Sequence, residues 1–461
     1  MKDAQSRTLR YDLVPFFHNE LERCFRQQTP DLNTPPELPS KLVVDAWHLN
    51  ASDIHFEPRS NGARVRLRID GLVWDVAELT DEEAKVFLNQ FKAMAAVDPV
   101  VRFLPGDASA SFKVLDRNLD LRVALAPSSR GETMAVRLLD TKRLERSIVE
   151  LGLDAANVQK FKDWLGVISG MFLAAGPTGS GKTTTAYSLL HELKSANRII
   201  IALEEPVEYQ VDGVTQINID ALHNLTFAEG IKAMLRHDPD FLMLGEIRDA
   251  ASAQTAARAA ISGRGLLSTI HCRDAVSSVT ALRHWGLSDR EIADSLAVVV
   301  AQRLARRLCE RCRKRVRPPA AEVAWLKSIR IAAPAKVWQP EGCKECKNLG
   351  YRGRIGIFEV WRLREEDYQG ILAGADELAL KRNLARRGHQ FLIADALRKV
   401  ENGITSLQEI KRLGTYIQPV VTKGKSSRRR RPAHAPPSVA RRLMPPQNRS
   451  LSNNKTRSRK D

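Results

Sequence analysis

The stretch that decides the fold of this chain is Met171-Phe172-Leu173-Ala174-Ala175-Gly176-Pro177-Thr178-Gly179-Ser180-Gly181-Lys182-Thr183-Thr184-Thr185. An apolar run of five residues leads into the pattern G-x-x-x-x-G-K-[ST], and a helix-forming run follows at residues 186–193. A strand, a glycine-rich loop and a helix in this order predict a phosphate-binding turn, because backbone N–H groups and the helix N-terminus then face one anion. We therefore expect a nucleotide-binding α/β domain.

The residue types within this loop match the needs of a triphosphate and its Mg²⁺. Glycines let the backbone approach a phosphate closely and adopt positive φ. Lys182 is placed to reach the β- and γ-phosphates, and the Thr183 hydroxyl is placed to bind Mg²⁺. The predicted nucleotide-binding residues are Gly176, Pro177, Thr178, Gly179, Ser180, Gly181, Lys182, Thr183 and Thr184.

Length and composition are those of a globular protein with two or three domains. The chain has 461 residues, of which 43% are hydrophobic, and this is enough to bury sizeable cores. Its longest nearly apolar stretches, 165–176 and 296–301, are too short to cross a bilayer, and no basic-then-apolar signal peptide opens the sequence. We expect a cytoplasmic protein.

The positive charge is concentrated at one end of the chain. Of the formal net charge of +18, residues 417–461 carry +12, with 13 Lys or Arg and one Asp, which leaves +6 for the other 416 residues. This segment is rich in Pro, Ser and Arg and has too little apolar material to fold alone. We expect a solvated tail, with contact to anionic lipid or to nucleic acid as alternatives.

Changes in pattern divide the chain into six predicted segments. The alternating residues 64–69 end in Asp70-Gly71, which is typical of a strand entering a tight hairpin. Beyond residue 151 strands alternate with helices, which predicts a parallel sheet covered on both faces. The segments are 1–40, an N-terminal helix and Pro-rich linker; 41–148, an α+β domain; 149–308, the P-loop core; 309–350, a cysteine segment; 351–416, a helical region; and 417–461, the basic tail.

Acidic and histidine residues follow three of the predicted strands, which we place at 198–203, 241–244 and 265–270. Ligands bind at the carboxyl ends of such strands in open α/β sheets. The residues at these ends are Glu204 and Glu205, Glu246, and His271.

Each of these four side chains has a predicted role and a structural alternative. We expect Glu246 to orient the attacking water and support Mg²⁺, since positioning and electrostatics supply most of the catalysis in phosphoryl transfer. Glu204 and Glu205 are expected to hold Mg²⁺ through water. His271 is expected to sense the γ-phosphate or to contact Glu246. The alternatives are a helix cap for Glu246, a solvated acidic turn for the glutamate pair, and a purely structural histidine.

The cysteines predict a structural metal site. Two Cys-x-x-Cys pairs, separated by thirty residues, have the spacing of a four-thiolate zinc site, in which a closed shell of sulfurs leaves no open position for catalysis. The expected zinc ligands are Cys309, Cys312, Cys343 and Cys346, and the alternative is four independent free thiols. Cys24 and Cys272 are expected to be ordinary buried thiols.

Together these motifs resemble one family, the secretion ATPases of type II secretion systems and type IV pilus assembly. The likeness runs from about residue 51 to residue 415. The segments that carry it are 51–58 and 66–71, similar to the second N-terminal domain of the family; 176–183, its Walker A loop; 204–209, its acidic box; 235–240 and 245–249, its Walker B region; 268–271, its histidine box; and 302–309 and 350–356, which flank the cysteines.

The resemblance implies a RecA-like P-loop ATPase domain preceded by a smaller PAS-like α+β domain and carrying a tetracysteine zinc subdomain. It further implies a homo-hexameric ring, with ATP, Mg²⁺ and Zn²⁺ as cofactors, at the cytoplasmic side of a bacterial inner membrane. Its partners would be an inner-membrane platform and cytoplasmic adaptor proteins of a pilus or secretion machine. By the same resemblance, Arg122 and Arg137 are expected to be presented to the nucleotide, where guanidinium groups stabilise phosphoryl charge.

The sequence also departs from the family pattern. Glu205 stands where the family usually has Asp, Arg264 where it has His, and Cys272-Arg273 where Thr-Asn is common. We expect the first N-terminal domain, with which many members of the family dock on a membrane partner, to be absent or reduced to about forty residues.

Other functions stay open at this point. One is a pilus-retraction or DNA-uptake motor of the same superfamily, although the retraction branch lacks the tetracysteine segment. The others are a nucleic-acid-binding zinc protein and a scaffold that binds ATP without hydrolysis. Nucleic acid is the less expected partner because the folded part is only weakly basic and has no interleaved aromatic and basic residues.

Overall fold

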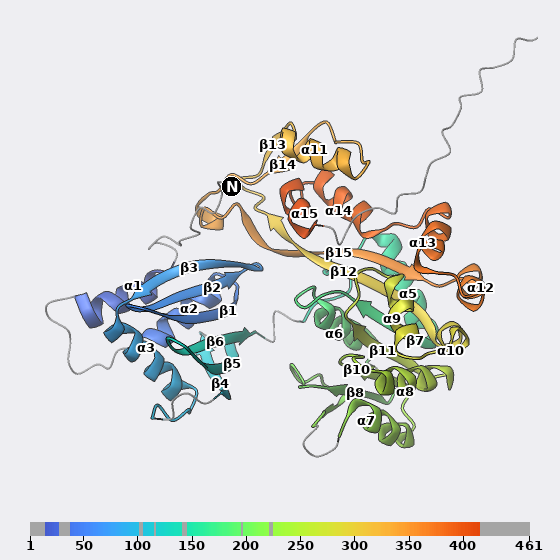
Figure 1. Ribbon diagram of the computed structural model, residues 1–461, viewed down its shortest axis with the longest axis horizontal. Coiled ribbons are helices and arrows are strands. Elements are labelled where there is room, and N and C mark those ends of the chain that lie inside the picture. Colours follow the sequence, from blue (N-terminus) through green and yellow to red (C-terminus); the bar gives the residue numbers. More distant parts are fainter. Residues whose placement is uncertain are drawn as a thin grey trace, which may run out of the picture. The chain divides into compact units, whose positions relative to one another are not determined.

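The computed structural model describes residues 14–26, 37–100, 105–114, 117–140, 145–194, 197–220 and 225–414. Within them the strands form a six-stranded sheet, a seven-stranded sheet and a two-stranded sheet. Figure 1 labels these elements along the chain. The predicted basic tail 417–461 and part of the predicted N-terminal helix lie outside the described residues.

The six-stranded sheet is antiparallel throughout, in the order β3-β2-β1-β6-β5-β4. Its strands are β1 (Ala51–Arg59), β2 (Gly62–Ile69), β3 (Leu72–Leu79), β4 (Gly106–Val114), β5 (Arg117–Ser128) and β6 (Gly131–Leu139). The predicted hairpin is confirmed: β2 and β3 are joined at Asp70 (φ 49°) and Gly71 (φ 83°). Two positive φ values in a two-residue loop are those of a type I′ turn.

Among the described residues, the helical elements that accompany this sheet are α1 (Pro15–Leu21), the π-helical η2 (Glu22–Arg26), α2 (Leu38–His48) and α3 (Asp81–Met94). α3 begins with a capping box in which the Thr80 side chain accepts from the Glu83 backbone and the Glu83 side chain accepts from the Thr80 backbone, an arrangement that satisfies two otherwise unpaired N–H groups. The core contains Phe56, Phe87 and Phe91, whose rings pack 5.1–5.7 Å apart. The α+β character expected for this segment is therefore present.

The seven-stranded sheet has the order β15-β12-β7-β11-β10-β8-β9. Its strands are β7 (Gly170–Ala175), β8 (Ile200–Glu204), β9 (Thr215–Asn218), β10 (Phe241–Leu244), β11 (Gly265–Ile270), β12 (Leu296–Leu308) and β15 (Tyr351–Arg362). The four strands expected from the sequence are β7, β8, β10 and β11, and all four are parallel. Every residue of each is buried, as continuous apolar runs predict for a sheet covered on both faces.

One edge of this sheet differs from the expected parallel pattern. β12 runs parallel to β7, but β15 pairs with β12 antiparallel over most of its length. The first twelve residues of the segment 351–416 are therefore strand rather than helix. The helices of the remainder are α12 (Glu365–Leu372), α13 (Glu377–Arg386), α14 (Leu392–Glu401) and α15 (Leu407–Leu413).

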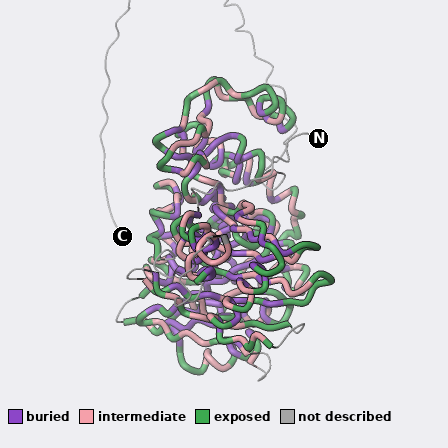
Figure 2. Tube along the Cα trace, turned by 90° about the vertical axis from the view of Figure 1, so that its left-hand side faces the viewer, coloured by how far each residue is buried: buried purple, intermediate pink, exposed green. Residues whose placement is uncertain are grey.

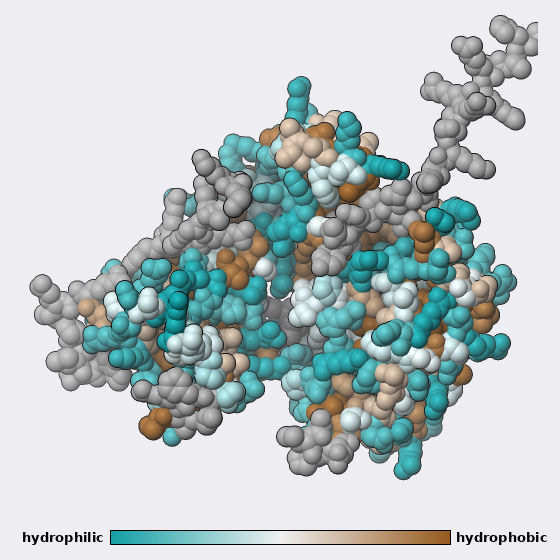
Figure 3. All heavy atoms as spheres, in the orientation of Figure 1, coloured by the Kyte–Doolittle hydropathy of each residue, from teal (hydrophilic) through white to brown (hydrophobic). Residues whose placement is uncertain are grey.

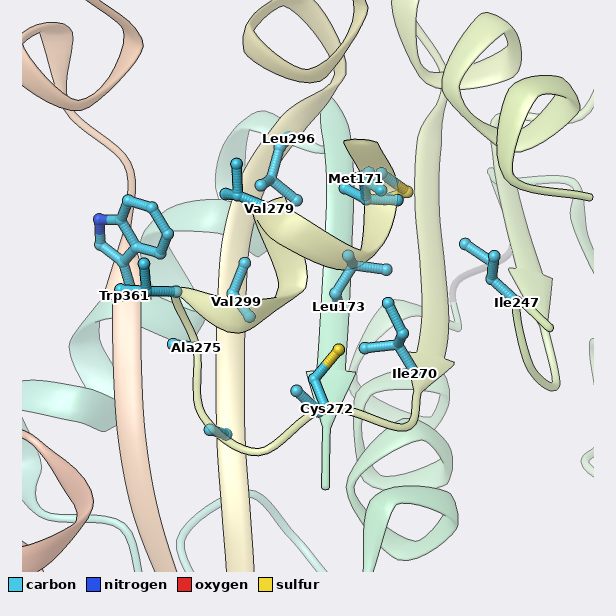
Figure 4. Packing of buried hydrophobic residues seen from close by; sticks show 14 of the residues in the cluster. Met171, Leu173, Ile247, Ile270, Cys272, Ala275, Val279, Leu296, Val299 and Trp361 are labelled. Carbon is cyan, nitrogen blue, oxygen red and sulfur yellow. The ribbon is translucent and has the colours of Figure 1, made fainter. Parts of the chain in front are cut away.

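Helices between the strands cover the sheet: α5 (Ala155–Val167), α6 (Lys182–Leu193), α7 (Phe227–Met234) with the 3₁₀ turn η4 (Leu235–His237), α8 (Ala250–Ile261), α9 (Ser277–His284) and α10 (Asp289–Ser295). Figure 4 shows side chains of β7, β11, α9, β12 and β15 packing together, among them Leu173, Ile270, Val299 and Trp361. This packed core holds the strands in position and therefore also positions the residues that follow the carboxyl ends of the strands.

A small cysteine-containing segment lies in sequence between β12 and β15. It consists of β13 (Lys314–Val316), α11 (Ala320–Ser328), β14 (Val337–Gln339) and the 3₁₀ turn η5 (Lys344–Cys346), with β13 and β14 paired antiparallel.

The surface is polar where the figures display it. In Figure 2, buried positions (purple) run through the inner strands and helices, while exposed positions (green) collect at outer turns. On the face drawn in Figure 3, hydrophilic side chains predominate and hydrophobic ones form small separate groups. Among the described residues, no helix is both long enough and apolar enough to span a bilayer.

Candidate nucleotide site and tetracysteine cluster

The phosphate loop has the backbone that its glycines predict. Gly179 and Gly181 adopt φ values of 73° and 92°, which L-residues with a Cβ rarely adopt. At Gly176 the limit is space, because a Cβ there would lie 2.4 Å from Oγ of Ser180 and 2.7 Å from the carbonyl oxygen of Gln302. Ser180 Oγ is itself buried and has no hydrogen-bond partner among the described residues. A buried hydroxyl without a partner inside this loop fits an anionic ligand.

Lys182 and Thr183 stand at the start of α6, where the loop becomes a helix. The Lys182 ammonium donates to the carbonyl oxygen of Gly176 over 2.8 Å and to that of Pro177 over 3.3 Å. Burial lowers the pKa of Lys182, and the charge of Glu246 opposes this shift. Thr183 is exposed. The lysine is therefore folded over the loop, with carbonyl partners that a phosphate oxygen can replace.

One cavity of about 370 Å³ joins the predicted motifs. Its lining includes the loop residues Thr178, Gly179, Gly181, Lys182, Thr183 and Thr184, the strand-end residues Glu204, Glu205, Glu246 and His271, and also Arg248, Thr269 and Arg354. The Walker A loop, the acidic box, the Walker B region and the histidine box thus meet at the carboxyl edge of the parallel sheet.

Glu246 occupies the centre of a short chain of polar contacts. Its Oε1 lies 2.7 Å from Nε2 of His271, and its Oε2 accepts from Nε of Arg248 over 2.8 Å. Backbone hydrogen bonds hold this strand end, since Gly245 donates to Leu203 over 2.7 Å. Burial lowers the pKa of His271, as does the positive charge of Lys182, while Glu246 opposes both. The predicted contact between His271 and Glu246 is present.

The two acidic-box glutamates have different surroundings. Glu204 is 3% exposed and accepts hydrogen bonds from Tyr187 Oη (2.6 Å) and Gln216 Nε2 (3.0 Å). Burial raises the pKa of Glu204, and these hydrogen bonds oppose the shift. Glu205 is partly exposed and its carboxylate contacts Arg248. Glu204 therefore ties the acidic box to α6, while Glu205 reaches the residues around Glu246.

Tyr187, Gln216 and Arg248 were not among the predicted site residues. Arg248 lies inside the Walker B segment 245–249, so its position in this motif is a signal from which it can be identified as a site residue. Tyr187 and Gln216 carry no motif, and only the fold brings them to Glu204.

Arg122 and Arg137 are direct cross-strand neighbours on β5 and β6. Arg122 Nη2 lies 3.1 Å from Oε2 of Glu208, and Arg137 Nε lies 3.2 Å from Oδ1 of Asp53. Neither arginine lines the cavity that contains the phosphate loop. The two arginines are thus neighbours in the strand register of β5 and β6, but the structure does not bring them to the phosphate loop.

The residues that depart from the family pattern lie outside the cavity lining, except for Glu205. Arg264 pairs with Asp238 over 3.3 Å, before the amino end of β11. Cys272 is buried against Ser277 and is visible in Figure 4 beside Ile270. Cys24, the other cysteine outside the Cys-x-x-Cys motifs, is half-buried, and its pKa is raised to about 11, chiefly by burial.

The four cysteines of the paired motifs converge. Their Sγ atoms lie within 4.8 Å of one another, with separations of 3.8 Å for Cys309 and Cys343, 3.8 Å for Cys312 and Cys346, and 3.7 Å for Cys343 and Cys346. A tetrahedral zinc ion with Zn–S bonds of about 2.3 Å places its sulfurs about 3.8 Å apart.

Backbone N–H groups also point at these sulfurs. Gly342 donates to Cys312 over 3.3 Å, and Gly350 donates to Cys346 over 3.2 Å. Such bonds stabilise thiolates, the form that binds metal. Distances and donor set both fit one zinc ion.

A parallel sheet with a Walker A loop, acidic strand ends and a histidine in one cavity defines a P-loop ATPase. The chain belongs to the family of type II/IV secretion system proteins, which it matches over residues 30–412.

Curated relatives support this membership. The chain is 37% identical over 374 residues to a putative type II secretion system protein E of Escherichia coli (strain K12), a match that spans 81% of this chain and 76% of that protein. It is 36% identical to the type II secretion system protein E of Aeromonas hydrophila, over 81% of this chain and 74% of that protein. The type IV pilus assembly ATPase PilB of Acinetobacter baylyi is 35% identical, over 81% of this chain and 65% of that protein.

Solved structures share the fold at low sequence identity. The ATPase DotB of Legionella pneumophila matches with a TM-score of 0.61 and 18% identity, over 84% of this chain and 97% of that chain. The pilus retraction motor PilT with bound ADP matches with a TM-score of 0.53 and 20% identity, over 82% and 96%. The expected α/β ATPase fold and the expected family are confirmed.

Proposed function

We propose that this protein hydrolyses ATP as a homo-hexameric motor that drives assembly of a type IV pilus or a type II secretion pseudopilus. The observation that carries the proposal is the single cavity in which the phosphate loop, Glu246 and His271 meet. Family membership and the names of the curated relatives, which refer to type II secretion and to pilus assembly, support assembly rather than retraction as the task of the proposed motor.

The chain's own residues have distinct proposed tasks at this site. The loop N–H groups and Lys182 would hold the β- and γ-phosphates, and the Thr183 hydroxyl would bind Mg²⁺, which would neutralise phosphate charge. Glu246 orients the attacking water, and His271 holds the other oxygen of that carboxylate. Glu204 keeps its buried contact with Tyr187 and so fixes the acidic box.

Arg122 and Arg137 belong to this proposal as groups delivered from outside the cavity. Each is paired with a carboxylate in the described structure. Guanidinium groups that reach the phosphates only after a conformational change make hydrolysis depend on the state of the ring. The arginines would then couple ATP turnover to movement between domains.

We propose a structural zinc ion on the four cysteines and a peripheral location at a bacterial inner membrane. The partners would be a membrane platform and a cytoplasmic adaptor of the same machine. The basic tail 417–461 would add contact with an anionic leaflet, because each Lys or Arg near such a surface contributes about 1 kcal/mol.

The test is Mg²⁺-dependent ATP hydrolysis per protomer, measured as protein concentration rises. We expect turnover to climb with concentration, because assembly completes the site. Lys182→Ala should abolish it through loss of phosphate contacts, and Glu246→Gln should keep nucleotide binding but stop hydrolysis. Normal turnover in Glu246→Gln would remove Glu246 from its role, and wild-type protein that binds ATP without turnover at any concentration would favour a scaffold.

A further inference from the structure

Arg248 connects the ends of two neighbouring strands at the nucleotide cavity. It lies just after β10, whose backbone pairs in parallel with β8. Its Nε donates to Oε2 of Glu246 over 2.8 Å, and its Nη1 contacts Oε2 of Glu205. One planar guanidinium therefore joins Glu246, two residues beyond the end of β10, to Glu205, the residue directly after β8.

The other oxygen of Glu246 is held as well. His271 Nε2 lies 2.7 Å from Oε1, so each carboxylate oxygen has its own partner. A carboxylate fixed at both oxygens cannot rotate about its terminal bond without breaking a contact. Glu246 is only 15% exposed, whereas Arg248 and Glu205 are 52% and 39% exposed. The least exposed member of the chain is thus Glu246, the carboxylate whose charge also acts on Lys182 of the phosphate loop.

These ion pairs are too exposed to contribute much to folding. Exposed pairs of this kind stabilise a protein by roughly 0–1 kcal/mol. Their effect is instead on orientation: a guanidinium has a rigid fork of donors that can bind two carboxylates at once, which an ammonium cannot do with the same geometry. The position of Arg248 over Glu246 depends on the anchor at Glu205.

We propose that Arg248 is a positioning residue for ATP hydrolysis and that Glu205 acts on Glu246 through it. In this arrangement Glu205 holds Arg248, Arg248 and His271 hold Glu246, and Glu246 presents a fixed oxygen to the attacking water. This rests on the proposed ATP hydrolysis and replaces the role of Mg²⁺ holder expected for Glu205. The length of the Glu205 side chain matters, because Asp would be shorter by one methylene and would lose the contact with Arg248.

The experiment compares Glu205→Gln, Arg248→Gln and the double variant in kcat, KM for ATP, and the Mg²⁺ concentration for half-maximal rate. We expect each single variant to lower kcat by about 10- to 100-fold, the range for a misplaced catalytic group, with KM and the Mg²⁺ requirement unchanged. The double variant should be no slower than the slower single variant, because both substitutions break the same chain. Arg248→Lys should recover part of the rate, and Glu205→Asp should lose about as much as Glu205→Gln.

Matched controls are Arg290→Gln and Glu229→Gln, which remove exposed partners of Asp294 and Lys232 on α10 and α7. Both should turn over like the wild type. The proposal is overturned if Glu205→Gln raises the Mg²⁺ requirement while Arg248→Gln does not, if the two effects multiply, or if Arg248→Gln leaves kcat unchanged.

A second readout does not depend on turnover and so separates this proposal from that of ATP hydrolysis. The side-chain ¹⁵N resonance of His271 reports its hydrogen bond to Glu246. It should shift in the same direction in Glu205→Gln and Arg248→Gln and stay in place in the two controls. An unchanged His271 resonance in both variants would show that Glu246 is held without Arg248, even in a protein that hydrolyses ATP.

Discussion

Tyr187→Phe removes one hydroxyl from a buried hydrogen-bond network and leaves the ring in place. Tyr187 Oη donates to Oε2 of Glu204 over 2.6 Å, and Gln216 donates to Oε1 over 3.0 Å. Tyr187 is 0% exposed and Glu204 3%, so bulk water cannot replace the lost donor. The substitution therefore leaves a buried carboxylate with one side-chain donor where it had two.

The expected cost follows from the charge of the acceptor. A hydrogen bond to an ionised group contributes about 1.5–3 kcal/mol, whereas one between neutral groups contributes about 0.5–1.5 kcal/mol. At about 1.4 kcal/mol per factor of ten, losing the bond to Glu204 should raise the opening equilibrium of β8 by about 10- to 150-fold in the pH range where this carboxyl group is ionised. The matched control is Tyr209→Phe: the Tyr209 ring lies 4.3 Å from the Tyr187 ring between centroids, and its hydroxyl lies 3.1 Å from a ring nitrogen of His191. That change should raise the opening equilibrium by about 2- to 10-fold.

The assay is amide hydrogen exchange across β8, which reports the local opening free energy. Protection at β8 should fall much further in Tyr187→Phe than in Tyr209→Phe. Equal losses in the two variants, or a loss below about threefold in Tyr187→Phe, would refute the reasoning that an ionised Glu204 depends on this donor.

The pH dependence has a definite sign. Burial raises the pKa of Glu204 above its unfolded value, against the hydrogen bonds from Tyr187 and Gln216. A carboxyl group of this kind stabilises the fold most at low pH, and this contribution is lost as pH rises through the folded-state pKa. Removal of the Tyr187 hydroxyl raises the pKa further, so the loss of protection should be larger near pH 8 than near pH 5.

Two further predictions concern the cysteines and the tail. Cys343→Ser should lower bound zinc well below one ion per chain and loosen the segment between β12 and β15, because three thiolates no longer close the tetrahedral shell; retained stoichiometric zinc, measured by elemental analysis, would contradict the site, with Cys24→Ser as the matched control. Deletion of 417–461 should abolish cosedimentation with vesicles that contain anionic phosphatidylserine and leave the background with neutral vesicles unchanged; binding that survives the deletion would place the membrane contact elsewhere.

The fold could be predicted from the sequence where a strand is buried on both faces, because such a strand is recognisable as a local run of apolar residues. β7 and β10 are apolar runs, β11 is a mainly apolar run that contains Ser268 and Thr269, and the phosphate loop, Glu246 and His271 follow these strands within two residues; the structure places all three strands as expected. The antiparallel edge strand β15 was missed because its pairing partner, β12, is separated from it by the whole cysteine segment. Pairing over such a distance leaves no local pattern in either strand.

The site could be predicted only as far as motifs reach. The motifs identify Glu204 and Glu205 as a pair, but the two differ in burial because one side chain meets Tyr187 on α6 and the other meets Arg248. Both contacts are tertiary. The same holds for Arg122 and Arg137: their register across two strands is visible in the structure, whereas their proposed approach to a phosphate requires a movement. Their role therefore stays a prediction.

The four cysteines lie at the end of the β12–β15 strand pair, and their position determines where residues can be inserted into the segment between the two strands. β12 ends directly before Cys309, strand pairing continues to Leu308 and Tyr351, and β15 begins five residues after Cys346. The thirty residues between Cys312 and Cys343 are closed at their base by the cysteines and are themselves folded: β13 pairs with β14, and Leu326 of α11 and Val337 of β14 are buried in the main core. Doubling the length of a flexible closed loop costs only about 0.6 kcal/mol. Insertions or labels are therefore expected to be tolerated at the exposed turn between α11 and β14, around Ala332 and Ala333, where they leave the buried residues of the segment and the register of β12 and β15 in place.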